Sequence, residues 1–187
     1  MHWSIADMLL DLVHNSVQAD AGHVRIELRR SDGEMAIRIE DDGKGMDSHQ
    51  QVLAIDPFYS EPGKHAGRRV GLGLPFLVQT VTTVDGWYRL ESEAGRGTTL
   101  EIRFNPDHID CPPMGDVAGM LAAMLTFSGQ YELEFHRSVR ASDTDTESEY
   151  RVSRAELLHA LGELETVESR SLLRDFLHSQ EAHISSV

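Results

Sequence analysis

The chain has 187 residues and a formal net charge of −14, with 40% hydrophobic and 26% charged residues. This length can bury a full hydrophobic core, and the composition is that of a soluble globular protein. The negative charge argues against a general nucleic-acid-binding surface, and no apolar run is long enough to predict a membrane-spanning segment. Since the start of the chain lacks the basic and apolar pattern of a signal peptide and Cys111 is the single cysteine, we expect a cytoplasmic protein.

The first predicted element is an amphipathic helix over residues 4–19, where apolar side chains recur at helical spacing. Asp11 and Asn15 lie one turn apart on it and therefore share a face. Asn is a poor helix former and costly to bury, so we expect a functional role for Asn15, with a solvated helix face as the alternative. The neighbouring His14 either contacts the same ligand or lies on the surface.

Two strands follow as an antiparallel hairpin, because residues 24–28 and 35–40 alternate between apolar and polar side chains. The second strand delivers Asp41, whose carboxylate can accept a hydrogen bond from an exocyclic amine such as that of adenine. Gly43 and Gly45 permit positive φ and the close approach of a flat heterocycle. We interpret this stretch as a nucleotide pocket, and an ordinary strand-ending Asp/Gly turn is the alternative.

Beyond a short helix ending near Leu53, regular periodicity stops between residues 56 and 70. Prolines and glycines there are interleaved with cations, including Lys64, which predicts a lid or binding segment; an idle surface loop is the alternative. An apolar helix through Val81 then opens with Gly71, Leu72 and Gly73. The free amides and positive dipole of such a helix start favour an anion.

Two more strands are predicted at residues 87–91 and 98–104. Helices that do not regularly alternate with strands predict an α+β fold, a two-layer sandwich of a mixed sheet covered on one face by helices. We place the end of this first domain at residue 105. Residues 106–187 form a small C-terminal α+β module of no recognised family, in which a methionine-rich helical stripe is either core or binding groove.

Taken in order, these motifs resemble those of the GHKL superfamily, the Bergerat-type ATP-binding fold of DNA gyrases, ninety-kilodalton heat-shock chaperones, sensor histidine kinases and mismatch-repair ATPases. Residues 11–21 resemble its N box, residues 41–46 its first glycine box and residues 71–74 its second glycine box. Residues 57–59 and 91–100 resemble flanking segments of histidine kinases. The order and spacing together make this resemblance specific, and it covers residues 5–104.

The resemblance implies a role for each matching residue. Asn15 would coordinate the magnesium ion that bridges the phosphates of ATP, since Mg²⁺ prefers hard oxygen ligands. Asp41 would bind the adenine amino group, and the base pocket would be shaped by Gly43, Gly45 and Met46. The phosphates would be contacted by Lys64, Gly71, Leu72 and Gly73. Asp11, the candidate catalytic residue, stands where the hydrolytic branch has a water-activating Glu and is one methylene shorter.

These features predict a Mg-ATP-binding, nucleotide-controlled switch that acts on a partner protein, with slow or partner-dependent ATP hydrolysis. The alternative is a protein kinase component that phosphorylates a partner in trans, of the histidine kinase or anti-sigma serine kinase type. A third hypothesis is a binding module without turnover. No helical hairpin with a phosphoacceptor His precedes the ATPase region, so self-phosphorylation in the usual arrangement is not expected. The sequence does not decide whether the protein forms a homodimer.

Overall fold

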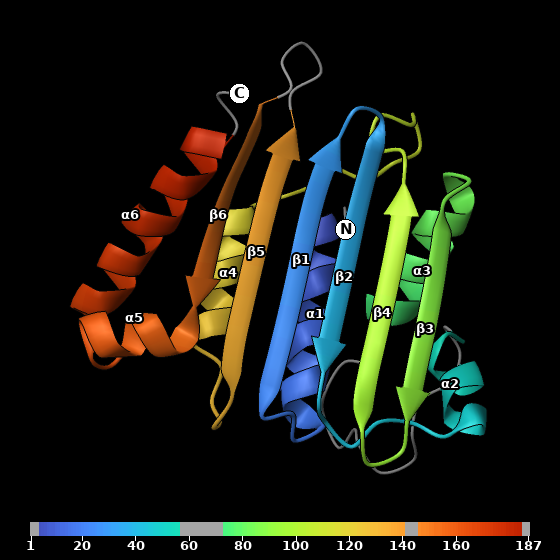
Figure 1. Cartoon of the computed structure of the whole chain (residues 1–187), viewed down its shortest axis with the longest axis horizontal. Coiled ribbons are helices and arrows are strands. Elements are labelled where there is room, and N and C mark those ends of the chain that lie inside the picture. The colour runs from blue at the N-terminus through green and yellow to red at the C-terminus, as the bar shows by residue number, and fades with distance from the viewer. Residues whose placement is uncertain (1–3, 57–72, 141–145, 185–187) are drawn as a thin grey trace.

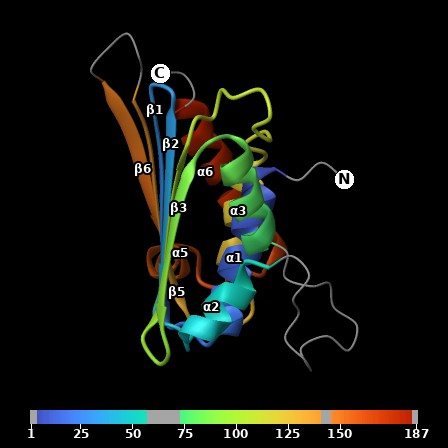
Figure 2. The same ribbon diagram turned by 90° about the vertical axis from the view of Figure 1, so that its right-hand side faces the viewer.

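The computed structural model describes residues 4–56, 73–140 and 146–184, which form one six-stranded sheet with helices on one of its faces (Figures 1 and 2). The predicted α+β class and two-layer sandwich are therefore confirmed. The strands are β1 (His23–Ser31), β2 (Glu34–Asp41), β3 (Trp87–Glu93), β4 (Gly97–Phe104), β5 (Glu132–Arg140) and β6 (Glu147–Ser153). The helices are α1 (Ile5–Gln18), α2 (Ser48–Ala54), α3 (Gly73–Thr83), α4 (Val117–Leu125), α5 (Arg154–Leu161) and α6 (Val167–Ile184).

The strand order is β3-β4-β2-β1-β5-β6, and neighbours are antiparallel except for the parallel pair β1 and β5. The N–H of Glu132 donates to the Gly22 carbonyl at 2.8 Å, which starts this parallel pair. β5 and β6 thus extend the sheet that the first part of the chain begins. The domain boundary at residue 105, one position after β4, stays a prediction.

The hydrophobic core lies between the sheet and the helices, with α1 packed against α3 on one side and α4 on the other. α1 begins at a capping box in which the Ser4 hydroxyl and the Asp7 carboxylate each accept the other residue's backbone N–H. Met120 and Met124 of α4 are buried. The methionine stripe is therefore core. None of the helices described has the length and hydropathy needed to span a membrane.

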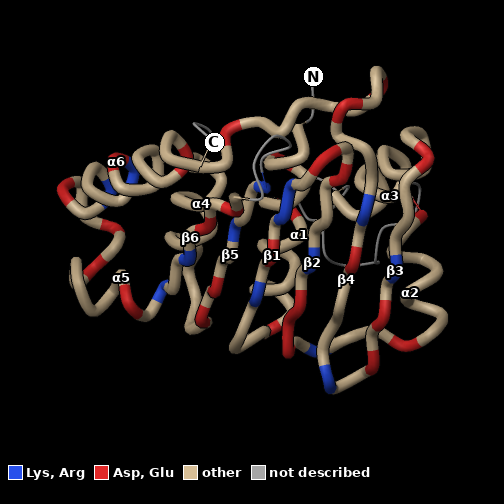
Figure 3. The backbone as a smooth tube through the Cα atoms, turned by 45° about the horizontal axis from the view of Figure 1, so that its top comes forward, with Lys and Arg blue, Asp and Glu red and all other residues tan. Residues whose placement is uncertain are grey.

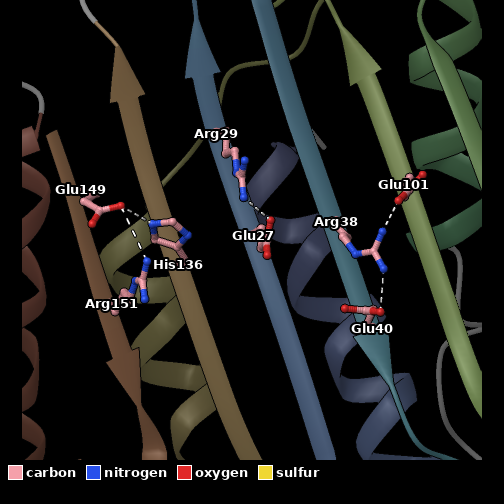
Figure 4. A network of polar contacts seen from close by, with 8 residues as sticks. All are labelled: Glu27, Arg29, Arg38, Glu40, Glu101, His136, Glu149 and Arg151. Atoms are coloured by element: carbon pink, nitrogen blue, oxygen red, sulfur yellow. Dashed lines mark hydrogen bonds and ion pairs between the residues drawn. The ribbon is translucent and has the colours of Figure 1, made fainter. Parts of the chain in front are cut away.

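Charged residues are spread along the strands of the sheet (Figure 3), at the exposed positions that alternate with the buried ones. One row crosses all six strands in register, from β3 to β6: Arg89, Glu101, Arg38, Glu27, His136 and Arg151. Arg38 donates to both Glu101 and Glu40 (Figure 4), and its hydrogen bond lowers the pKa of the Glu40 carboxyl. Because charges of opposite sign lie next to one another, the face that carries this row is suited to water rather than to an apolar partner.

Candidate functional site

Asp41 is the last residue of β2, and its carboxylate is held from two directions. Oδ2 accepts a hydrogen bond from the buried hydroxyl of Ser16 on α1 at 2.7 Å, and Oδ1 accepts one from the backbone N–H of Gly43 at 3.0 Å. Each carboxylate oxygen has two lone pairs, so both retain the capacity to accept from a further donor. The half-buried carboxylate is thus fixed in orientation and still able to bind an amine.

Residues 43–46 form a loop that packs closely against the protein's own backbone. A Cβ on Gly43 would lie 2.9 Å from the Ala19 carbonyl oxygen at the end of α1. Gly45 has φ +61°, and a Cβ there would lie 2.0 Å from the Glu93 carbonyl oxygen. These contacts by themselves require glycine at both positions. A close approach of a heterocycle, the reason expected from the sequence, is therefore not needed to explain either residue.

Met46 ends this loop and is held at both of its backbone polar groups. Its N–H donates to the Ser92 hydroxyl at 2.8 Å. Its carbonyl accepts from the side-chain amide of Gln51 on α2 at 3.3 Å, and the same amide donates to the Ser92 carbonyl at 2.8 Å. The loop is therefore fixed at its start by Asp41 and at its end by Ser92.

Asp11 connects α1 to the start of α3. Its Oδ2 accepts a hydrogen bond from the backbone N–H of Gly73 at 2.8 Å, and a Cβ on Gly73 would lie 2.6 Å from that same oxygen. The Asp11 carboxylate thus satisfies one of the free amides at the N-terminus of α3, as a helix-capping side chain does. Glycine is needed at position 73 for this close approach.

Asn15 lies one turn after Asp11, and its side chain is exposed. The next residue, Ser16, donates to Asp41, and Asp11 accepts from Gly73, so α1 supplies a hydroxyl at the end of β2 and a carboxylate at the start of α3. The His14 ring packs on Phe127 with 4.9 Å between ring centroids. His14 is therefore a contact to the C-terminal segment, which the sequence did not indicate.

The contacts join Asp11 to Gly73 and Asp41 to Gly43. Asn15 lies on α1 between Asp11 and Ser16, while Gly45 and Met46 lie farther along the loop. Lys64, Gly71 and Leu72 lie outside the described residues, as does the rest of the predicted lid from residue 57 onward. Within the described part of the chain, no group of three or more His, Cys, Asp or Glu side chains is placed to hold a metal ion. The candidate metal ligand Asn15 offers an amide oxygen instead, which is a hard ligand suited to Mg²⁺.

Ser16, Gln51 and Ser92 belong to this site but were not identified from the sequence. Ser16 carried one signal, because it falls on the apolar stripe of α1, four residues after Leu12, where a polar side chain needs a partner. Ser92 lies within residues 91–100, which resemble a flanking segment of histidine kinases, but that resemblance gave it no role, and Gln51 carried no signal. Their roles depend on how the β3–β4 turn and α2 meet the loop.

Comparison with known proteins identifies a family for the first part of the chain. A model described as "Histidine kinase-, DNA gyrase B-, and HSP90-like ATPase" matches residues 4–108. Sporulation kinase C of Bacillus subtilis is 28% identical over 100 residues, which are 52% of this chain and 22% of that protein. The histidine-protein kinase AtoS of Escherichia coli is 35% identical over 101 residues, 52% of this chain and 16% of that protein. The chain thus spans less than a quarter of the length of either relative.

Among solved structures, the N-terminal domain of a DNA repair protein superposes with a TM-score of 0.54 at 12% identity. The superposition covers 86% of this chain and 57% of that one. The family model covers only residues 4–108 of the 187, so part of the C-terminal segment must be included in the superposition. This likeness concerns the fold alone.

Proposed function

Since this chain belongs to the histidine kinase-, DNA gyrase B- and HSP90-like ATPase family, we propose that it is a Mg-ATP-binding protein that works as a nucleotide-controlled switch on a partner protein. The observation that carries this proposal is the Asp41 carboxylate, which Ser16 and Gly43 hold in one orientation with acceptor capacity left over. Adenine has an exocyclic amine that such an acceptor can bind. Proteins of this family bind ATP, usually with Mg²⁺.

In this proposal the residues divide between the two ends of the nucleotide. Asp41 accepts from the adenine amine, next to the loop of Gly43, Gly45 and Met46. Asn15 supplies an oxygen ligand to Mg²⁺, and bound Mg²⁺ neutralises part of the phosphate charge, which matters in a chain of net charge −14. The phosphates are contacted by Lys64, Gly71 and Leu72 and by the start of α3 at Gly73, although the N–H of Gly73 itself donates to Asp11.

Slow hydrolysis is part of the proposal and is supported by the position of Asp11. A general base must come within hydrogen-bond reach of the attacking water. The Asp11 carboxylate is one methylene shorter than a Glu, and one of its oxygens accepts from the Gly73 amide at 2.8 Å. We therefore propose that a partner completes the site, as an arginine finger does in other nucleotide switches.

A second candidate function is a kinase component that phosphorylates a partner in trans. The observation that favours it is the match to relatives named as kinases over the same part of the chain. In either case we propose a protein partner, with a homodimer as one form that the assembly can take. We also propose a cytoplasmic location, since the lone Cys111 cannot form an internal disulfide.

Two experiments test this proposal. Calorimetry on the purified chain should show binding of ATP that weakens when Mg²⁺ is removed by a chelator; no binding at millimolar ATP would refute it. Incubation with γ-labelled ATP and a co-purified partner then separates the candidate functions. Free labelled phosphate indicates an ATPase, label on the partner indicates a kinase, and neither product indicates a binding module without turnover.

A further inference from the structure

Ser92, the second-last residue of β3, has a hydroxyl whose bonding capacity is fully used. Its Oγ lies 2.8 Å from the Met46 backbone N, 2.9 Å from the Gly97 carbonyl oxygen and 2.9 Å from the Thr98 hydroxyl. A serine hydroxyl has one proton to donate and two lone pairs. The Gly97 carbonyl can only accept, so it takes the proton, and Ser92 accepts from both Met46 and the Thr98 hydroxyl.

Gln51 also links Met46 to Ser92. The side-chain amide of Gln51 donates one hydrogen to the Ser92 carbonyl and the other to the Met46 carbonyl. The Met46 N–H is therefore bonded to the Ser92 hydroxyl, and the Met46 carbonyl is bonded to the side-chain amide of Gln51. Because a half-buried backbone N–H without a partner is costly, removal of the Ser92 hydroxyl would release this end of the loop.

The Ser92 contacts lie at the same end of the sheet as Asp41. Thr98 is the register partner of Asp41 in the β2–β4 pair. A Cβ on Gly97 would lie 1.9 Å from the Asp41 carbonyl oxygen, so the β3–β4 turn passes directly against the backbone of Asp41. The Lys44 carbonyl accepts from Gly95 in this turn at 2.7 Å. The loop over residues 43–46 thus packs against the end of β3 and the β3–β4 turn.

We propose that Ser92 is a positioning residue for the nucleotide pocket, because its hydroxyl fixes Met46 and with it the conformation of the loop over residues 43–46. The inference rests on the proposed function, in which this loop shapes the pocket for the base. It assigns the β3–β4 turn a part in nucleotide affinity although Ser92 itself makes no contact with the ligand. Loss of the hydroxyl lets the loop sample other conformations, and each of them binds the base less well.

The test compares Ser92→Ala, Ser92→Thr and the control Ser138→Ala in the full chain, with ATP and ADP titrated by calorimetry. Ser92→Ala should weaken both nucleotides about tenfold and by the same factor, since the loop acts on the base end they share. Ser92→Thr keeps the hydroxyl and suits a strand, so it should restore affinity. Ser138→Ala removes a buried hydroxyl from β5, in the same sheet but outside the site, and should change neither affinity.

Equal nucleotide affinity in wild type and a folded Ser92→Ala would overturn the inference, and so would a Ser92→Thr variant as weak as the alanine variant. If Ser92→Ala does not fold, Gln51→Ala replaces it, because Gln51 lies on α2, which contains no buried residue. Gln51→Ala should then weaken both nucleotides, and unchanged affinity would again overturn the inference. A wild-type chain that binds neither nucleotide contradicts the proposed function instead.

Discussion

The Asp11 carboxylate accepts the backbone N–H of Gly73 at 2.8 Å, so the middle of α1 holds the first turn of α3 across 62 positions of sequence. Asp11 therefore has a structural role in addition to the proposed catalytic one. The two roles need different properties of the side chain. Capping needs an acceptor oxygen, which Asn also has, whereas a general base needs a carboxylate.

Asp11→Asn and Asp11→Ala should therefore differ in stability but not in turnover. Asp11→Ala should lower the free energy of unfolding by about 1 kcal/mol, and Asp11→Asn should stay near the wild type. Both should leave ATP binding nearly intact and abolish the slow hydrolysis. Urea unfolding and single-turnover hydrolysis measure these effects. A wild-type rate of about 1 s⁻¹ or more without a partner would mean that the site is already complete, and hydrolysis unchanged in either variant would exclude Asp11 as the base.

Asp41→Asn should strongly weaken ATP binding without unfolding the chain. The amide keeps one acceptor oxygen, but its NH₂ group must face either the ligand amine, the Ser16 hydroxyl or the Gly43 N–H. Loss of a hydrogen bond to a charged group costs about 1.5–3 kcal/mol, or about 10–150-fold in affinity. Calorimetry on folded protein checks this prediction.

Asp85→Asn is the matched control for that substitution. It makes the same chemical change in an exposed turn between α3 and β3. It should bind ATP like the wild type. Equal ATP affinity in the wild type, Asp41→Asn and Asp85→Asn would show that Asp41 does not bind the nucleotide.

Truncation after residue 108, where the family match ends, should abolish cooperative unfolding. The fragment loses β5 from the side of β1 and α4 from the side of α1, which leaves β1 with one open edge and uncovers apolar surface. Thermal melting followed by circular dichroism tests this against the full chain. A fragment that melts cooperatively near the wild-type temperature would show that the first 108 residues fold by themselves.

The last prediction concerns alkaline pH and Tyr150. Burial, together with a hydrogen bond to Glu181, raises the pKa of Tyr150 above the ordinary value of about 10. The unfolded chain then loses the phenol proton first, so the stability from this group is fully present below about pH 10 and is lost as the pH rises. Tyr150→Phe should reduce that loss, while at pH 7 it costs about 1.5–3 kcal/mol for the missing bond to a carboxylate. Urea unfolding between pH 8 and 11 measures both effects, and parallel pH curves would contradict the prediction.

The local sequence pattern was sufficient to predict most of the individual elements. Apolar spacing located α1 and the β1–β2 hairpin to within a few residues. The apolar alternation does not mark the whole of β5 (Glu132–Arg140), because Arg137 interrupts the apolar face. Arg137 is nevertheless buried, with Nε 2.7 Å from Glu181 Oε1 of α6 in a close ion pair that lacks the alignment of a hydrogen bond. A charge that is buried against a partner 44 positions later leaves no signal in local periodicity.

For the candidate site, too, local sequence patterns indicated individual residues but not the contacts between distant segments. Asp11, Asn15 and Asp41 were identified because they lie in short motifs with recognisable spacing. The contacts of Asp11 with Gly73 and of Asp41 with Ser16 join segments 62 and 25 positions apart, and no local pattern specifies them. The resemblance to known ATPases implied ligand contacts for these residues, whereas the bonds that hold them in place became visible only in three dimensions.

The parallel pairing of β1 with β5 also has a consequence for how the protein is made. Val24 and Leu133, register partners in this pair, are 109 positions apart, and several helices and strands lie between them in the chain. Contacts of such long range slow folding, because the entropy of closing the loop is lost before the pairing stabilises anything. During synthesis, β1 leaves the ribosome long before its second neighbour exists. Until β5 is made, β1 can pair only with β2 and leaves its other edge open at the centre of the future sheet. We therefore expect the yield on expression to depend on chaperones and on temperature.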